Sequence, residues 1–146
     1  MSASVSAAGS ILWPALAHVG LVFVLYAWLT VARTLAVQRG ETEYACFVRG
    51  QDEPLHVARI TRNLSNQFEL PVLFYAFVVL LIALGRVTWI DVAAAWVFFG
   101  GRVIHTLVQT LTDDVVLRGR MFVINFLAVA VLAGHVELLA LDCVGR

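Results

Sequence analysis

Four apolar stretches, each long enough to cross a lipid bilayer, constrain this chain more than any other feature of its sequence. They cover residues 11–37, 55–84, 87–111 and 117–141. A bilayer core of about 30 Å needs roughly 20 helical residues, and no stretch alternates with the period of two expected of a barrel strand. Hydrophobic residues make up 61% of the chain and charged residues 14%, a balance that suits lipid better than water. The sequence therefore predicts an integral membrane protein that crosses the bilayer four times as α-helices.

The polar segments between these stretches predict how the helices connect. The chain is short enough that residues 1–146 are expected to form a single four-helix domain. Segments 85–86 and 112–114 read as tight turns, whereas segment 38–54 is long enough for a structured loop. Short connections make consecutive helices antiparallel neighbours, so the expected fold class is an all-α, up-down transmembrane four-helix bundle. Pro71 lies inside the second stretch and should bend that helix.

The distribution of arginine predicts the orientation of the bundle. Most arginines lie in or beside the first and third connections, and only Arg86 and Arg146 lie on the opposite side. By the positive-inside tendency, these two connections face the cytoplasm and both termini lie outside, as in a bacterial inner membrane. The formal net charge is zero, so no nucleic-acid partner is expected. The arginines of the first and third connections are Arg33, Arg39, Arg49, Arg59, Arg62, Arg118 and Arg120.

Polar side chains inside the second stretch indicate more than a lipid-facing helix. Arg59, Arg62, Asn66 and Glu69 follow at intervals of three, four and three, which places them on one helical face. Charged groups inside transmembrane helices cost about 2.5–3.5 kcal/mol each on insertion scales, so they normally face protein or a water-filled cavity. We therefore expect this face to point into the bundle.

The third and fourth stretches carry polar groups at the same end of the bundle. Arg102, His105 and Gln109 form a second stripe, and Arg118 opens the fourth helix. If the stripes converge, arginines outnumber carboxylates in the shared cavity, which favours an anionic, hydrogen-bonding ligand. The structural alternative is that Glu69 only neutralises a buried arginine and fixes the register of the helices.

Two motifs resemble the MAPEG family, the membrane-associated proteins in eicosanoid and glutathione metabolism. The first is RNLSNQFELPVLFY, from Arg62 to Tyr75, and the second is GRVIHT, from Gly101 to Thr106. The family includes microsomal glutathione transferases, leukotriene C synthase and microsomal prostaglandin E synthase, and the second motif is closest to the last. The resemblance covers the second to fourth helices well and the first helix by type and length. It implies a homotrimer with glutathione bound as a cosubstrate between adjacent subunits, near the cytoplasmic face.

The resemblance also implies roles for particular side chains. Glu69 would bind the ammonium of glutathione, and Arg118 would be catalytic, because a guanidinium near the sulfur favours thiolate over thiol. The reaction would be attack on a lipophilic electrophile or peroxide that arrives from the bilayer, catalysed by a glutathione-dependent transferase or peroxidase. The residues implied to bind glutathione are Arg62, Asn66, Glu69, Arg102, His105 and Gln109.

Four positions depart from the family's pattern. Gln109 and Phe122 stand where tyrosines are expected, Gly119 stands where a residue with a hydroxyl group is expected, and Ser65 stands where the prostaglandin enzyme has a further basic residue. Each departure removes a hydroxyl or cationic donor, worth about 0.5–3 kcal/mol depending on its partner. Specific prostaglandin chemistry is therefore not expected of this chain.

Two other hypotheses remain open at this point. The chain could keep the fold without catalysis, binding a lipid or another anion and scaffolding partners. It could also be a haem-binding bundle, because His18 and His135 lie at similar depth in the first and fourth stretches and histidines are usable axial ligands. No metal site is expected from Cys46 and Cys143, whose spacing matches no ligand motif. Asp91, near the outer surface, is expected to be solvated.

Overall fold

The structure is a computed structural model that describes residues 2–50 and 52–144, and the side chains of residues 7–50 and 52–142. Arg146 and the side chain of Cys143 lie outside the described residues. Within the described ranges the chain is helical and contains no strand. The elements are α1 (Ser2–Gln38), α2 (Tyr44–Arg49), α3 (Leu55–Ser65), the 3₁₀-helix η1 (Asn66–Phe68), α4 (Leu70–Ala83), α5 (Trp89–Leu111) and α6 (Val115–Val144).

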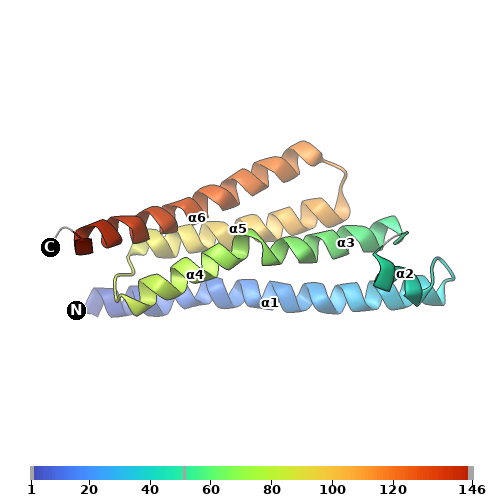
Figure 1. Cartoon of the computed structure of the whole chain (residues 1–146), viewed down its shortest axis with the longest axis horizontal. Coiled ribbons are helices and arrows are strands. Elements are labelled where there is room, and N and C mark those ends of the chain that lie inside the picture. The colour runs from blue at the N-terminus through green and yellow to red at the C-terminus, as the bar shows by residue number, and fades with distance from the viewer. Residues whose placement is uncertain (1, 51, 145–146) are drawn as a thin grey trace.

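The predicted up-down bundle is confirmed. In Figure 1, α1 begins and α6 ends at the same end of the bundle, while α2 and the connection between α5 and α6 lie at the opposite end, called the loop end here. In the part of the chain that the structure describes, four helical segments are long and apolar enough to span a membrane: Ala7–Gln38, Leu55–Ala83, Trp89–Leu111 and Val115–Asp142. The loop predicted over residues 38–54 contains the short helix α2.

The second transmembrane segment is broken, where the sequence predicts only a bend. The helix α3 ends at Ser65, η1 follows, and α4 begins at Leu70 with Pro71 in its first turn. Pro71 has no N–H to donate, and its ring clashes with the carbonyl four residues earlier, which is that of Gln67. Glu69 absorbs the change of direction with φ −99° and ψ −103°, outside the helical region. The polar stripe of this segment therefore spans a break in the backbone.

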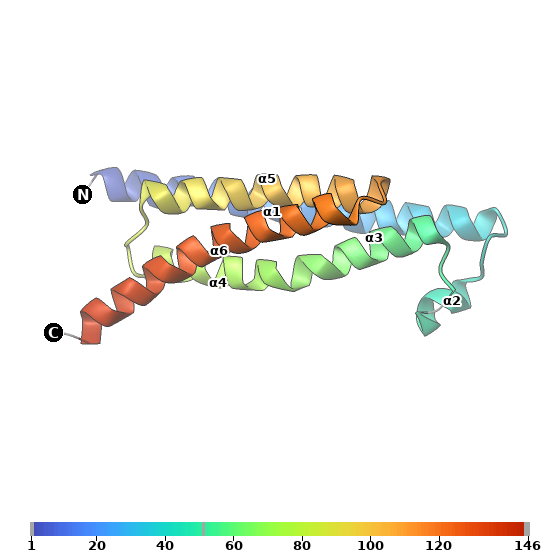
Figure 2. The same cartoon turned by 90° about the horizontal axis from the view of Figure 1, so that it is seen from above.

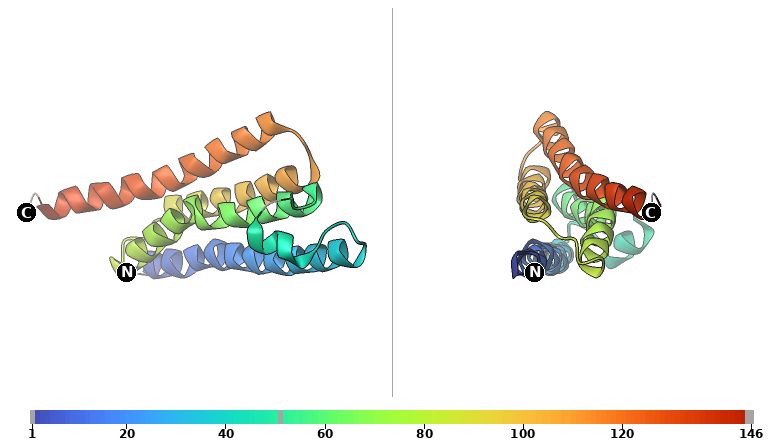
Figure 3. Two further views of the ribbon diagram at one scale, coloured as in Figure 1. Left: turned by 45° about the vertical axis from the view of Figure 1, so that its right-hand side comes forward. Right: turned by 90° about the vertical axis from the view of Figure 1, so that its left-hand side faces the viewer.

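Helix packing is asymmetric because α6 is tilted. Figure 2 shows α6 crossing obliquely from the loop end of α5 toward α4. Figure 3 shows α1 and α6 on opposite sides of the bundle, with α4 and α5 between them. Phe74 of α4 and Phe98 of α5 stack in the core with ring centroids 4.1 Å apart, and both are fully buried. Because α6 packs on α4 only toward the far end, the space between α3, α5 and the start of α6 is left open.

A glycine allows a close contact between α5 and α6. A Cβ at Gly101 would clash with the side-chain oxygen of Asn125, which is itself fully buried. Small residues permit such close packing in membranes, where helices associate by contact and not by a hydrophobic driving force. The preceding residue is not part of this contact, because a Cβ at Gly100 would meet no atom within 4 Å.

We predict that Gly101→Ala lowers the free energy of unfolding by about 1–3 kcal/mol, because the added methyl group overpacks the interface between α5 and α6. The measurement is the thermal unfolding midpoint of the purified protein in one detergent. Gly100→Ala is the matched control and should unfold close to wild type. The double variant Gly101→Ala with Asn125→Ala should recover part of the loss, since it removes the clashing atom. Equal midpoints for the Gly100 and Gly101 variants would contradict this account of the packing.

Candidate functional site

The open space at the loop end is a recess of about 370 Å³ between α3, α5 and α6. We call it the arginine recess. Its volume is in the range of pockets that hold small molecules, about 300–1,000 Å³. It is lined by Arg62, Asn66, His105, Gln109, Val115, Arg118, Gly119 and Phe122.

Each of the three helices contributes polar groups to the arginine recess. The amide of Asn66, at the end of α3, donates to the Gln109 side-chain oxygen at 3.0 Å, which joins α3 to α5. His105 lies one turn before Gln109 on α5 and is 3% exposed. Arg118 lies in the first turn of α6 and is partly buried. The predicted convergence of five side chains (Arg62, Asn66, His105, Gln109 and Arg118) is therefore present in the structure.

The charges in this recess are not balanced within the chain. Arg59 forms an ion pair with Asp113, and Arg33 forms one with Glu53. Neither Arg62 nor Arg118 has a carboxylate partner among the described residues. Both arginines also line an adjoining pocket of about 200 Å³, which Asp113 and Asp114 line as well. Two unpaired guanidinium groups on one recess leave positive charge there, as the sequence predicts.

Glu69 lies on the other side of Arg62. It lines a separate recess of about 470 Å³, here called the acidic recess, together with Asp52 and Glu53. Arg62 and Asn66 line both recesses, so they form the boundary between them. Glu69 lies between η1 and α4, where its backbone departs from helical geometry. The structure thus brings Glu69 next to Arg62 and Asn66 but not into the arginine recess.

Arg102 lies behind the arginine recess instead of lining it. Its side chain is 1% exposed. The guanidinium donates to the Asn66 carbonyl at 2.8 Å and to the Gln67 side-chain oxygen at 3.1 Å. The Asn66 carbonyl belongs to the last turn before the helix break, where carbonyls lose their intrahelical partners. Arg102 therefore supports the backbone that carries Asn66.

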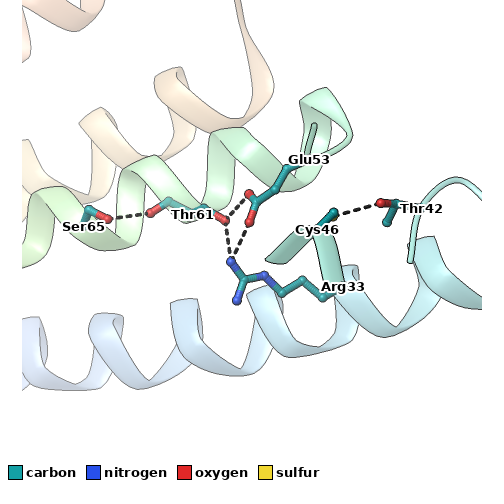
Figure 4. Close-up of polar contacts among 6 residues, drawn as sticks. All are labelled: Arg33, Thr42, Cys46, Glu53, Thr61 and Ser65. Carbon is teal, nitrogen blue, oxygen red and sulfur yellow. Dashed lines mark hydrogen bonds and ion pairs between the residues drawn. The ribbon is translucent and has the colours of Figure 1, made fainter. Parts of the chain in front are cut away.

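A clasp of polar side chains closes the loop end beside the acidic recess. Figure 4 shows the Arg33 guanidinium of α1 directed at the Glu53 carboxylate, at 2.8 Å, and at the Thr61 hydroxyl, at 3.2 Å. Thr61 donates in turn to the second oxygen of Glu53 at 2.8 Å. The Arg33 guanidinium also lies 4.8 Å from the centre of the Phe47 ring in α2. The clasp joins α1, α2 and α3 and fixes Glu53 at the edge of the acidic recess.

The expectation for Asp91, which lies at the end of the bundle opposite the recess, is wrong. It was expected to be solvated, but it is 1% exposed. It completes a capping box with Thr88, which begins α5, and both of its oxygens lie 3.0 Å from Nδ1 of His135. The sequence could not show this, because His135 reaches Asp91 only through the packing of α6 on α5.

The two histidines of the haem hypothesis have separate partners. His18 lies against Phe98 of α5, with ring centres 5.4 Å apart, and His135 binds Asp91. Phe98 and Asp91 are seven residues apart, about 10 Å along a helix. Two axial ligands of one iron must face each other across it, and α1 and α6 lie on opposite sides of the bundle (Figure 3). This arrangement argues against a haem site between these histidines.

Two buried amides that the sequence analysis missed also support the site. Asn63 and Gln67 are both at most 2% exposed and bond to each other through the Gln67 amide at 3.0 and 3.2 Å. Amide side chains within an apolar stretch are a signal that could have identified them. They lie on the face of the second segment that looks toward α1 and α5.

Comparison with known protein families shows which family the chain belongs to. The family model of the MAPEG family matches residues 11–136, which include all four transmembrane segments in large part. The chain belongs to the MAPEG family. It is therefore an integral membrane protein of a family of glutathione and eicosanoid metabolism. Comparisons with curated proteins and with solved structures gave no significant match.

We predict that Glu53→Gln loosens the clasp in this MAPEG protein. The variant loses the charge of a partly buried ion pair, a change of about 1–3 kcal/mol, so the segment between α1 and α3 should open more often. The measurement is the rate of trypsin cleavage after Arg49 in the purified protein. Glu41→Gln is the control, because the Arg39–Glu41 pair is exposed and 3.9 Å apart, and it should be cleaved at the wild-type rate. Equal cleavage of the two variants would show that the clasp does not hold the segment.

Proposed function

We propose that this protein is a membrane-bound, glutathione-dependent transferase or peroxidase that acts on lipophilic electrophiles. The observation that carries the proposal is the pair of unpaired arginines, Arg62 and Arg118, on one recess of a MAPEG bundle. Glutathione is an anionic tripeptide with two carboxylates and a thiol, so it matches a recess with excess positive charge. Membership of a family associated with glutathione supports this choice of anion.

The side chains divide the work of binding according to their charge. Arg62, at the boundary of the two recesses, binds a carboxylate, and Asn66 and Gln109 offer amide hydrogen bonds beside it. Glu69, on the acidic side of Arg62, is the partner for the ammonium. Arg102 acts from behind, through the Asn66 carbonyl. His105 lines the recess between these groups and the start of α6.

Arg118 is the proposed catalytic residue. Its guanidinium lines the recess and has no carboxylate partner among the described residues, so it is free to stabilise a thiolate and raise its concentration at neutral pH. The thiolate forms a bond to an electrophilic carbon and displaces a leaving group with its electron pair. With a peroxide it attacks one oxygen and the O–O bond breaks, which gives the sulfenic acid of glutathione and an alkoxide that takes up a proton and leaves as the alcohol. The thiol of a second glutathione then displaces water from the sulfenic acid and forms the disulfide.

The membrane around the site and the orientation of the protein in it are part of the proposal. We propose a homotrimer in a bacterial inner membrane, with the loop end in the cytoplasm, where glutathione is available, and both termini outside. The arginine-rich connections at the loop end support this orientation. The electrophile reaches the recess from the lipid beside Phe122, which is 47% exposed.

The departures from the family's pattern favour a second candidate function. Gln109, Gly119 and Phe122 line the arginine recess, so three of the four changes fall on the site itself, and the fourth, Ser65, lines the acidic recess. Gln109 replaces a hydroxyl donor by an amide that bonds Asn66, and Gly119 and Phe122 supply no side-chain donor. The alternative is a non-catalytic MAPEG protein that uses the two arginines to hold a lipid or another anion and scaffolds partners. It predicts a co-purifying anionic lipid and no turnover with chlorodinitrobenzene.

We predict that Arg118→Ala weakens glutathione binding roughly 10- to 150-fold, the loss of one charge-assisted hydrogen bond. The measurement is isothermal titration of reduced glutathione into the protein in lipid nanodiscs, together with the turnover of chlorodinitrobenzene. Arg120→Ala is the matched control, because Arg120 is exposed and lines none of the three recesses described above. Its affinity should stay within about twofold of wild type, as for most exposed charges.

Two results would separate the candidate functions. Wild-type protein that binds no glutathione at millimolar concentration contradicts the proposal and favours the lipid-binding alternative. Binding that Arg118→Ala and Arg120→Ala weaken equally would move the site away from the arginine recess.

A further inference from the structure

A chain of hydrogen bonds leads from α1 through the bundle interior to the arginine recess. The Tyr75 hydroxyl lies 2.7 Å from Nδ1 of His18, and Nε2 of His18 lies 3.1 Å from the Gln67 side-chain oxygen. The same oxygen accepts from Nε of Arg102 at 3.1 Å, and Arg102 donates to the Asn66 carbonyl at 2.8 Å. His18 lies in α1, which contributes no residue to the arginine recess.

The donors and acceptors in this chain can be assigned. The Gln67 amide nitrogen donates to the backbone and side-chain oxygens of Asn63, so the Gln67 oxygen faces Arg102. An arginine only donates, so this oxygen is an acceptor, and Nε2 of His18 must donate to it as well. Nδ1 of His18 is then the acceptor for the Tyr75 hydroxyl. The assignment follows from the network of partners and gives a neutral His18 with its proton on Nε2.

Burial makes this network rigid and excludes water from it. His18 is 0% exposed, Arg102 is 1% exposed and Gln67 is 2% exposed. In such surroundings an unpaired polar group is costly, so each member depends on its neighbours. The Gln67 oxygen is held from two sides, by His18 and by Arg102. Without His18, that oxygen has one donor fewer, and only its bond from Arg102 then holds it in place.

The network ends at the part of the backbone that shapes the recess. Asn66 closes α3 just before the break, and its amide bonds Gln109. Arg102 is charged at every physiological pH and cannot accept a proton, so the chain is not a route for proton transfer. The chain of hydrogen bonds instead holds Arg102 and the Asn66 backbone in place.

We propose that His18 is a positioning residue, which acts through Gln67 and Arg102 to hold Asn66 and the break between α3 and α4 in the geometry of the recess. The effect on glutathione binding rests on the proposed function; the effect on the backbone does not. Donation from Nε2 to Gln67 is the property that matters, so a side chain that restores this donor should restore the geometry.

The test compares two amide substitutions at this buried position. In His18→Gln the terminal amide nitrogen reaches the place of Nε2 and can donate to Gln67, whereas in His18→Asn the amide reaches only the place of Nδ1. The first readout is hydrogen–deuterium exchange of backbone amides in segment 63–72, which needs no ligand. The second is the dissociation constant for reduced glutathione. Tyr75→Phe is the control for the outer end of the network, where only the orientation of His18 is affected.

The expected result is faster exchange in segment 63–72 for His18→Asn, with unchanged exchange in α6, and an affinity for glutathione about 5- to 10-fold lower, the loss of one hydrogen bond. His18→Gln and Tyr75→Phe should stay close to wild type in both readouts. Equal behaviour of the Gln and Asn variants, whether both match wild type or both fail, would overturn the proposal. If wild type binds no glutathione, the proposed function falls, and the exchange data alone still decide the role of His18.

Discussion

The bond from the buried Arg102 guanidinium to the Asn66 carbonyl is the interaction on which the rest of the site depends. A membrane interior offers no water to a broken helix, so backbone groups freed by a break must find partners in the protein. The break before Pro71 frees carbonyls in the middle of the second transmembrane segment, and Arg102 supplies a donor to one of them. In return, the break gives a buried arginine the acceptors that it needs. The broken helix and the buried arginine therefore satisfy each other's hydrogen-bonding groups.

The charges at the loop end lie on different recesses. Glu69 lies on the acidic recess, Arg62 borders both recesses, and Arg118 lines the arginine recess and the adjoining pocket but not the acidic recess. Neither Arg62 nor Arg118 has a carboxylate partner among the described residues. This is the property that suits the loop end to an anionic ligand and, in our proposal, to the carboxylates and thiolate of glutathione.

Much of this arrangement can be predicted from the sequence because it depends on local pattern. Length and apolarity predict four spans, and a spacing of four residues places Arg62 with Asn66, and His105 with Gln109, on single faces. The direction of Arg102, the burial of Asp91 and the tilt of α6 could not be predicted. Arg102 turns inward because Gln67 and Asn66 offer acceptors there, Asp91 is covered by His135 from a distant helix, and α6 tilts over the contact of Gly101 with Asn125. All three depend on contacts between segments far apart in the chain.

The most direct test of the central claim is an experimental structure of the protein in lipid nanodiscs, determined by electron cryo-microscopy with millimolar reduced glutathione. The account predicts density for the tripeptide in the arginine recess, with a carboxylate on Arg62, its sulfur within reach of Arg118, and the break at Asn66 unchanged. Density elsewhere, or a recess in which Arg62 and Arg118 are neutralised by carboxylates of a neighbouring copy and no ligand is bound, would contradict it.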